Sequence, residues 1–129
     1  MVNSAIKAAR DAYAPYSEYH VGASLRLTNG EIIIGSNQEN AAYPSGLCAE
    51  RVARFYAGVR HPAVPVQSIA IAAIREGILQ EGPVAPCGAC RQVMSELLAV
   101  DAVIISCQSE TEFHSWSIGE LLPDSFVLS

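Results

Sequence analysis

The stretch VQSIAIAAI, residues 66–74, decides the fold of this chain. It is an almost unbroken run of β-branched residues and alanines, a composition typical of a strand covered on both faces. Residues 102–107 form a second buried strand of the same kind. Helical patterns precede and follow the first run, over about residues 47–58 and 88–98. This alternation predicts an α/β fold, a three-layer α/β/α sandwich with a mixed central sheet.

Shorter elements are expected to complete the fold at both ends of the chain. Asn3 or Ser4 is expected to cap a first helix that runs to about Ala14, before a proline. A short last helix is expected to begin at Ser117. The remaining expectations are strands at residues 21–27, 32–34 and 113–116, a turn at residues 28–31, and loops at residues 35–46 and 81–87.

The composition suits one domain, residues 1–129, built around one core. Half of the residues are hydrophobic and only 16% are charged, whereas an average domain has about 25% charged residues. So few charges leave little polar surface for a small monomer. Either some apolar surface is buried between subunits, or the core is simply rich in alanine.

The net charge and the cysteines limit the partners and the compartment. The net charge is −5, with only eight Lys and Arg, which argues against a nucleic-acid partner. The N-terminus, MVNSAIKAARDAY, lacks the apolar region of a signal peptide, and no apolar run approaches the roughly 20 residues that span a membrane. We therefore expect a cytoplasmic protein without membrane contact, whose four reduced cysteines suggest metal or redox chemistry.

Three of the cysteines fall where helices are expected to start. Cys48 opens the run Cys-Ala-Glu-Arg, and Cys87 and Cys90 belong to the run Pro-Cys-Gly-Ala-Cys. Helix N-termini carry unpaired N–H groups and partial positive charge, which favour thiolates. Three thiolates leave a tetrahedral zinc ion one open position, as in a catalytic site. Arg51 could offset their negative charge by donating hydrogen bonds to the sulfurs, or it could form an ordinary surface ion pair.

Glu50 lies two residues after Cys48, near the expected metal but on a different face of the helix. A carboxylate there could take a proton from water and deliver it to a substrate. The alternative is an ordinary first-turn acid that stabilises the helix dipole. The Cys-x-x-Cys spacing also fits a redox dithiol, but a dithiol needs neither a third cysteine nor a neighbouring acid. Cys107 closes an apolar strand and is interpreted as a small buried hydrophobic residue.

At these residues the sequence resembles the homotetrameric, zinc-dependent cytidine deaminases. The similarity extends over nearly the whole chain, and its most specific part is the pairing of Cys-Ala-Glu with Pro-Cys-Gly-Ala-Cys at this spacing. Other matching runs are Ala-Pro-Tyr-Ser at residues 14–17, Val-Gly-Ala at 21–23, Asn-Gln-Glu-Asn-Ala-Ala-Tyr at 37–43 and Leu-Leu-Pro at 121–123.

The resemblance implies hydrolytic deamination of cytidine and deoxycytidine, in pyrimidine salvage, by a zinc-dependent enzyme. It implies that Cys48, Cys87 and Cys90 bind Zn²⁺ and that Glu50 moves the protons. It implies further roles for residues that are otherwise ordinary loop, core or interface residues. Asn37 and Glu39 would bind the ribose hydroxyls, Tyr19 and Ala49 would contact the ligand, and Tyr43 and Phe126 would reach a neighbouring subunit's site.

The chain departs from the family pattern at two of these positions. Tyr19 stands where Phe is usual, which adds a hydroxyl to the edge of the pocket, and the chain stops three residues after Phe126. An unphosphorylated pyrimidine nucleoside fits the absence of a Gly-rich phosphate loop and of a basic cluster. Three alternatives remain: deamination of a nucleoside-like antibiotic such as blasticidin S, a thiol-disulfide oxidoreductase, and a non-catalytic zinc-stabilised binding module.

Overall fold

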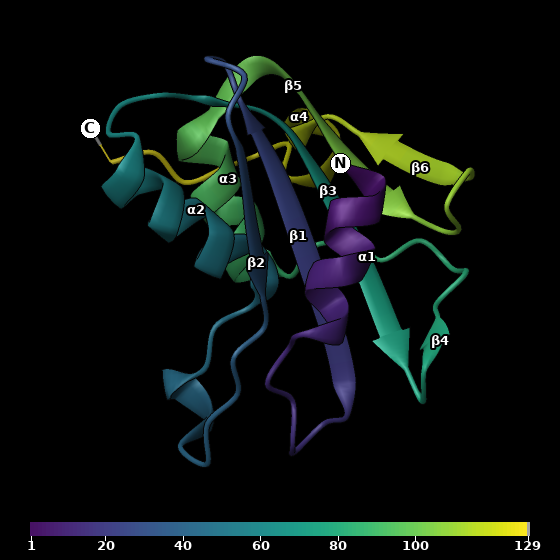
Figure 1. The fold of residues 1–129 in the computed structure, drawn as a ribbon. Coiled ribbons are helices and arrows are strands. Elements are labelled where there is room, and N and C mark those ends of the chain that lie inside the picture. Colours follow the sequence, from purple (N-terminus) through teal and green to yellow (C-terminus); the bar gives the residue numbers. More distant parts are fainter. Residues whose placement is uncertain (129) are drawn as a thin grey trace.

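The structure is a computed structural model that describes residues 1–128, and strand β3 (Val66–Arg75) lies at its centre. The sheet has the strand order β2-β1-β3-β5-β6, and β4 pairs with β3 beside this path (Figure 1). In chain order the other elements are α1 (Val2–Arg10), β1 (Tyr19–Leu27), β2 (Ile32–Ser36), η1 (Tyr43–Ser45), α2 (Ala49–Arg60), β4 (Ile78–Leu79), α3 (Gly88–Leu97), β5 (Leu98–Cys107), β6 (Phe113–Trp116) and α4 (Ile118–Leu121).

The sheet is mixed because one of its pairings is parallel. β3 and β5 run in the same direction, and α3 lies in the connection between them, as parallel pairing requires. The pairs β1–β2, β1–β3, β3–β4 and β5–β6 are antiparallel. The mixed sheet with flanking helices confirms the expected α/β fold.

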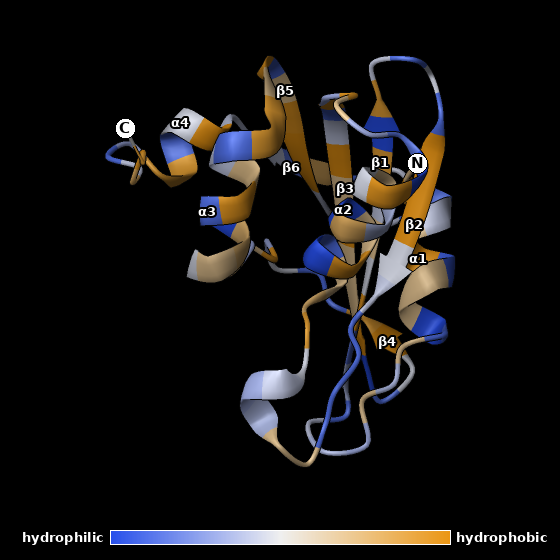
Figure 2. Ribbon diagram, turned by 90° about the vertical axis from the view of Figure 1, so that its left-hand side faces the viewer, coloured by the Kyte–Doolittle hydropathy of each residue, from blue (hydrophilic) through white to orange (hydrophobic). Residues whose placement is uncertain are grey.

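Both faces of β3 are buried, as its sequence predicts. Ile69 and Ile71 point into a core cluster that includes residues of α2 and α3. The alternate residues Ala70 and Ala72 point into a second cluster, which contains residues of α1. Figure 2 shows α1 and α3 on opposite sides of the sheet, whose strands are largely hydrophobic. Alternate side chains of this one strand therefore belong to two separate cores, one on each face of the sheet, and the molecule has three layers.

Two glycines let helices lie directly on the sheet. A Cβ atom at Gly22 of β1 would come within 2.1 Å of the Ala5 carbonyl oxygen of α1. A Cβ atom at Gly35 of β2 would come within 2.6 Å of the Ala53 amide nitrogen of α2. Both distances are far below van der Waals contact, so any larger residue would push the helix away from the strand.

The first helix differs from its expected boundaries at both ends. It starts at Val2 with Met1 as its N-cap, and no side chain caps it, so the expected caps Asn3 and Ser4 are wrong. It ends at Arg10 instead of near residue 14 because the following backbone pairs elsewhere. The Tyr13 amide donates to the Asn37 carbonyl, and the Glu39 amide donates to the Tyr13 carbonyl.

Further differences occur where turns and strand pairing override the local pattern. β5 begins at Leu98 instead of residue 102, because α3 ends in an extended C-cap that passes directly into the strand. β4 was not expected; it pairs with β3 after a turn in which Glu76 and Gly77 both have positive φ. The expected loop at residues 35–46 contains the short helix η1. The last helix is capped by Ser117, as predicted.

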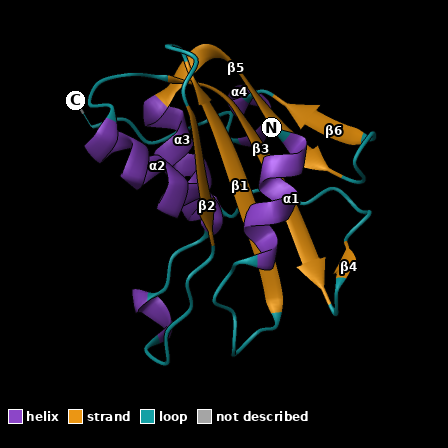
Figure 3. Cartoon of the chain, in the orientation of Figure 1, coloured by secondary structure: helices purple, strands orange, loops and turns teal. Residues whose placement is uncertain are grey.

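The loops that follow α1 and β2 lie together at one end of the sheet (Figure 3). α2 and α3 both begin with a cysteine as the N-cap. Within residues 1–128, no helix combines the length and the apolar character needed to cross a membrane.

Candidate active site

The N-termini of α2 and α3 bring three thiols together. Cys48 is the N-cap of α2, Cys87 is the N-cap of α3, and Cys90 lies in the first turn of α3. Their Sγ atoms all lie within 4.8 Å of one another, although Cys48 is 39 residues away from Cys87 in the sequence. Cys90 is fully buried, whereas Cys87 is exposed. The cluster therefore has a buried base and one side that a ligand can reach.

The spacing of the thiols fits a tetrahedral metal ion. Two sulfurs bound to tetrahedral zinc at about 2.3 Å lie roughly 3.8 Å apart. The Sγ atoms of Cys48 and Cys87 are 3.6 Å apart. A set of three soft sulfur donors suits zinc and leaves one of four positions for water or substrate.

Arg51 lies one turn along α2 and faces the sulfur of Cys48. Its Nη2 atom donates a hydrogen bond to Cys48 Sγ at 3.5 Å. The pKa of the Cys48 thiol is lowered because it accepts hydrogen bonds from Cys90 and from Arg51. The pKa of the Cys90 thiol is raised, because it donates to Cys48 and is buried. The cluster thus stabilises negative charge on Cys48, next to a guanidinium group.

Glu50 lies in the first turn of α2 and is only 6% exposed. Together with Arg51 and Cys90 it lines a small internal cavity, which is separate from the larger cavity that Cys48 lines. The pKa of this carboxyl is raised from 4.5 to about 7, first by burial and also by the neighbouring charge on Cys48. A carboxyl group that titrates near neutral pH can both accept and donate a proton during a reaction.

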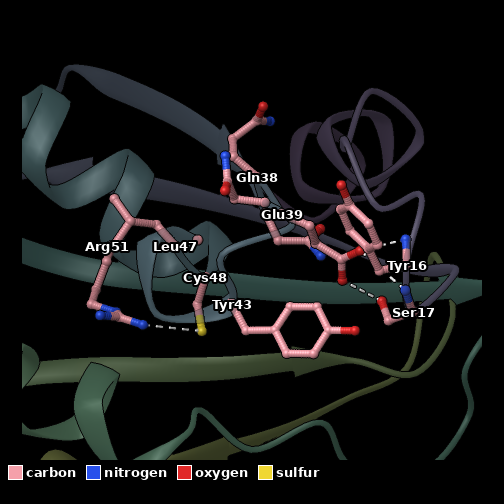
Figure 4. A pocket seen from close by; sticks show the side chains of 11 residues that line it. Tyr16, Ser17, Gln38, Glu39, Tyr43, Leu47, Cys48 and Arg51 are labelled. Carbon is pink, nitrogen blue, oxygen red and sulfur yellow. Dashed lines mark hydrogen bonds between the residues drawn. The ribbon is translucent and has the colours of Figure 1, made fainter.

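A cavity of about 530 Å³ lies beside the thiol cluster and is lined by one of its three cysteines, Cys48. Its walls come from the α1–β1 loop, from the loop after β2 and from the start of α2 (Figure 4). This volume is in the range of small-molecule sites. The lining residues are Tyr16, Ser17, Asn37, Gln38, Glu39, Asn40, Tyr43, Gly46, Leu47, Cys48 and Arg51.

Asn37 joins the cavity wall to strand β1. Its Oδ1 atom accepts a hydrogen bond from the Val21 amide at 2.8 Å, and its Nδ2 atom donates one to the Tyr19 carbonyl at 2.9 Å. A primary amide has two N–H donors. These contacts therefore fix the side chain and leave it one N–H group for a ligand.

Glu39, which also lines the cavity, is held by the α1–β1 loop. Its Oε1 atom accepts from the Tyr16 amide at 3.0 Å and from the Ser17 amide at 3.1 Å. Its Oε2 atom accepts from the Ser17 hydroxyl (Figure 4). The pKa of Glu39 is lowered, first by the Ser17 hydroxyl and also by both backbone amides. The carboxylate is thus ionised, and Oε2 keeps acceptor capacity for a ligand.

The remaining residues singled out from the sequence lie at several places. Tyr43 lines the cavity with its ring 76% exposed, and Ala49 is fully buried at the start of α2. Tyr19 is half-buried at the start of β1. Phe126 is 67% exposed, and its carbonyl accepts a hydrogen bond from Gln92 Nε2 at 3.0 Å. Among residues 1–128, neither Tyr19 nor Phe126 lines the large cavity.

Cys107 lies in the second core cluster, on the face of the sheet that α1 covers, and is fully buried. Tyr16 and Ser17 both contact Glu39, although the sequence pattern predicted no role for either of them. Their only sequence signal is the run Ala-Pro-Tyr-Ser, which matches the family pattern but does not indicate a contact across 22 residues.

Comparisons with known proteins agree with this geometry. Residues 1–107 match the family model described as the cytidine and deoxycytidylate deaminase zinc-binding region. The cytidine deaminase of Halalkalibacterium halodurans is 40% identical over 129 residues, which cover 98% of this chain and 92% of the relative. A cytidine deaminase of Mycobacterium tuberculosis is 33% identical over 125 residues, 97% of this chain and 86% of the relative.

Solved structures share both the fold and the sequence. The crystal structure of cytidine deaminase from Burkholderia pseudomallei superposes with a TM-score of 0.82 at 40% identity, over 97% of this chain and 95% of that chain. The structure of the Mycobacterium tuberculosis enzyme gives a TM-score of 0.78 at 30% identity, over 99% and 95% of the two chains. With its zinc-binding region and its cluster of three thiols, this chain belongs to the cytidine and deoxycytidylate deaminase family.

Proposed function

We propose that this chain is a zinc-dependent hydrolase that deaminates cytidine and deoxycytidine to uridine and deoxyuridine, releasing ammonia, in pyrimidine salvage. The observation that carries the proposal is the meeting of three thiols with a buried glutamate at the N-termini of α2 and α3. The cytidine deaminases that align with almost the whole chain support the substrate. One domain, residues 1–129, would carry the whole activity.

Cys48, Cys87 and Cys90 would hold the zinc ion, and Arg51 would stabilise the thiolate of Cys48. When bound, zinc supplies Lewis acidity that brings the pKa of a water molecule close to neutrality. Glu50 takes a proton from the water whose oxygen attacks C4 of the pyrimidine. It gives this proton to N3. It then takes the remaining proton from the new C4 hydroxyl and gives it to the amino nitrogen, so that the C4 carbonyl forms, the C4–N bond breaks and ammonia leaves. The pKa of about 7 suits a group that both accepts and donates.

Asn37 and Glu39 would bind the sugar. The free N–H of Asn37 Nδ2 can donate to a hydroxyl oxygen, and Glu39 Oε2 can accept a hydroxyl hydrogen. Both residues line the cavity that also contains Cys48, so a ligand there can reach the metal and the sugar site together. Tyr19 and Ala49 are proposed as further ligand contacts on the strength of the family resemblance, since neither lines this cavity among residues 1–128.

We propose that the enzyme is a homotetramer with composite sites. Tyr43 and Phe126 are 76% and 67% exposed, so both side chains are available to a neighbouring subunit. Phe55, Tyr56 and Val59 on α2 are also largely exposed. A neighbouring subunit would cover such residues and would receive Tyr43 and Phe126 at its own site. The free thiols of a zinc site suit a reducing compartment, so we place the enzyme in the cytoplasm.

The test is direct conversion of cytidine by the purified, zinc-loaded protein. We expect the ultraviolet absorbance of cytidine to change as uridine forms, with one ammonia released per nucleoside and one zinc bound per chain. Protein that binds zinc and cytidine without producing ammonia would be a binding module, and this would refute the proposal. Thiol-disulfide exchange activity in zinc-free protein, without deamination by the loaded form, would instead indicate an oxidoreductase.

A further inference from the structure

The two carboxylate oxygens of Glu39 accept different numbers of hydrogen bonds. Oε1 accepts two backbone N–H groups, those of Tyr16 and Ser17, whereas Oε2 accepts one contact, the hydroxyl of Ser17. The last torsion of a glutamate side chain is broad and has weak preferences of its own. The direction in which Oε2 points therefore depends on the Ser17 hydroxyl.

The Ser17 hydroxyl is itself fixed from the other side. Its Oγ atom accepts a hydrogen bond from the Tyr19 amide at 3.0 Å, so its hydrogen is free to point at Glu39. Glu18, between these residues, has a positive φ of 58°, and its amide donates to the Ala14 carbonyl at 3.0 Å. A non-glycine residue keeps this conformation only where surrounding contacts hold it. The turn thus presents the hydroxyl in one direction.

The same short segment also connects the two proposed sugar-binding residues. The Tyr19 amide binds Ser17 Oγ, and the Tyr19 carbonyl binds Asn37 Nδ2. Ser17 and Asn37 are therefore held by one residue at the start of β1. The N–H donor of Asn37 and the acceptor Oε2 of Glu39 line one cavity in a fixed relation.

We propose that Ser17 is a positioning residue that orients the Glu39 carboxylate toward a sugar hydroxyl of the nucleoside. This inference rests on the proposed role of Glu39 in sugar binding. The Ser17 hydroxyl holds Oε2 in the cavity and keeps one of its lone pairs available to the ligand. It is also the first cause of the lowered pKa of Glu39, so it keeps the group an acceptor. Ser17 therefore acts on the recognition of the sugar and leaves the chemistry at the pyrimidine ring unchanged.

The experiment compares Ser17→Ala, Ser17→Thr and Ser17→Val in the zinc-loaded enzyme with cytidine as substrate. Thr and Val have nearly the same shape and differ in the hydroxyl, so this pair isolates the hydrogen bond even if the Ala variant folds poorly. We expect KM to rise roughly 3- to 10-fold in the Ala and Val variants, as for loss of one hydrogen bond to a partly exposed charged group. The Thr variant should stay close to wild type, and kcat should change less than about twofold.

A double-mutant cycle with Glu39→Ala, which removes the acceptor of the Ser17 hydroxyl, tests whether Ser17 acts through Glu39. If it does, adding Ser17→Ala to Glu39→Ala changes KM no further. With 2′,3′-dideoxycytidine, which lacks the 2′ and 3′ hydroxyls of the sugar, Ser17→Ala should leave KM unchanged if Glu39 binds one of these two hydroxyls. The control is Ser109→Ala in the β5–β6 turn, a partly exposed serine whose Oγ also accepts backbone hydrogen bonds, and we expect it to behave as wild type.

The outcomes separate this inference from the proposed function. If Glu39→Ala leaves KM for cytidine unchanged, the sugar-binding role of Glu39 is wrong. If Glu39→Ala raises KM but the Thr and Val variants have equal KM, the inference about Ser17 is wrong. It is also wrong if Ser17→Ala raises KM equally with and without the Glu39 carboxylate.

Discussion

Replacement of Glu50 by Gln separates a catalytic role from a structural one most sharply. The substitution keeps the size of the side chain and its capacity for hydrogen bonds, but it removes the carboxylate that would move protons. Glu50 does not belong to the cluster of three cysteines that would bind zinc, so zinc content should remain one per chain. Turnover should fall by at least ~10² to 10⁴, the usual contribution of general acid–base catalysis, because one group serves several proton transfers.

The structure also predicts that Glu50→Gln raises the free energy of unfolding of the metal-free protein at neutral and higher pH. Burial raises the pKa of Glu50 from 4.5 to about 7, so in metal-free protein the folded state holds this proton where the unfolded state has lost it. The stability of the wild type relative to the Gln variant therefore falls as the pH rises from 4.5 to about 7. Above this window the difference reaches about 3 kcal/mol in favour of the variant, and below it the difference disappears.

Two measurements on the same preparations check these expectations: deamination rate with zinc stoichiometry, and urea unfolding of metal-free protein at several pH values. Glu96→Gln, at an exposed position on α3, is the matched control and should change neither. A fully zinc-loaded Glu50→Gln enzyme that turns over cytidine at a near wild-type rate would disprove the proton-transfer role. Loss of zinc from this variant would instead make Glu50 a structural residue. If the difference in unfolding free energy between wild type and variant were the same at high and low pH, the effect of burial would be contradicted.

The other predictions concern the metal site and the assembly. Cys87→Ser should lose zinc and Cys107→Ser should retain it, because Cys107 lies in the core on the other face of the sheet; metal analysis showing the reverse would overturn the ligand set. Arg51→Gln removes the hydrogen bond to Cys48 and should weaken both zinc affinity and activity, so unchanged zinc affinity in a chelator competition would contradict this role. If the proposed homotetramer forms, Phe126→Ala should keep the assembly by light scattering but lose activity, and full activity in a tetramer would exclude the proposed contribution across subunits.

The sequence predicted the central architecture because its signal is local and strong. The run at residues 66–74 is apolar on both faces, and only a strand between two layers of helices can bury it in this way. The cluster of thiols was also predictable, because Cys48 and Cys87 each fall at a helix start. The two N-termini then need only lie side by side to bring the sulfurs together.

What the sequence could not predict depends on pairing between distant segments. The first helix ends early because Tyr13 pairs with the loop at Asn37 and Glu39. The contact between Ser17 and Glu39 has the same origin, since it requires two loops to meet at one end of the sheet. Local propensity is identical whether or not such loops meet, so neither feature leaves a sequence pattern of its own.

The close approach at Gly22 and Gly35 has a consequence for how this enzyme can evolve. β1 and β2 are neighbours, and their glycines let α1 and α2 rest on backbone from opposite sides. The position of α2, and with it Cys48 and Glu50, is therefore set by the thickness of the sheet beneath it. A helix shift of 1 Å at reacting groups can reduce a rate about 100-fold. Although Gly35 does not line the cavity, substitutions at this position would thus be selected against because they displace α2, just as substitutions of cavity-lining residues would be.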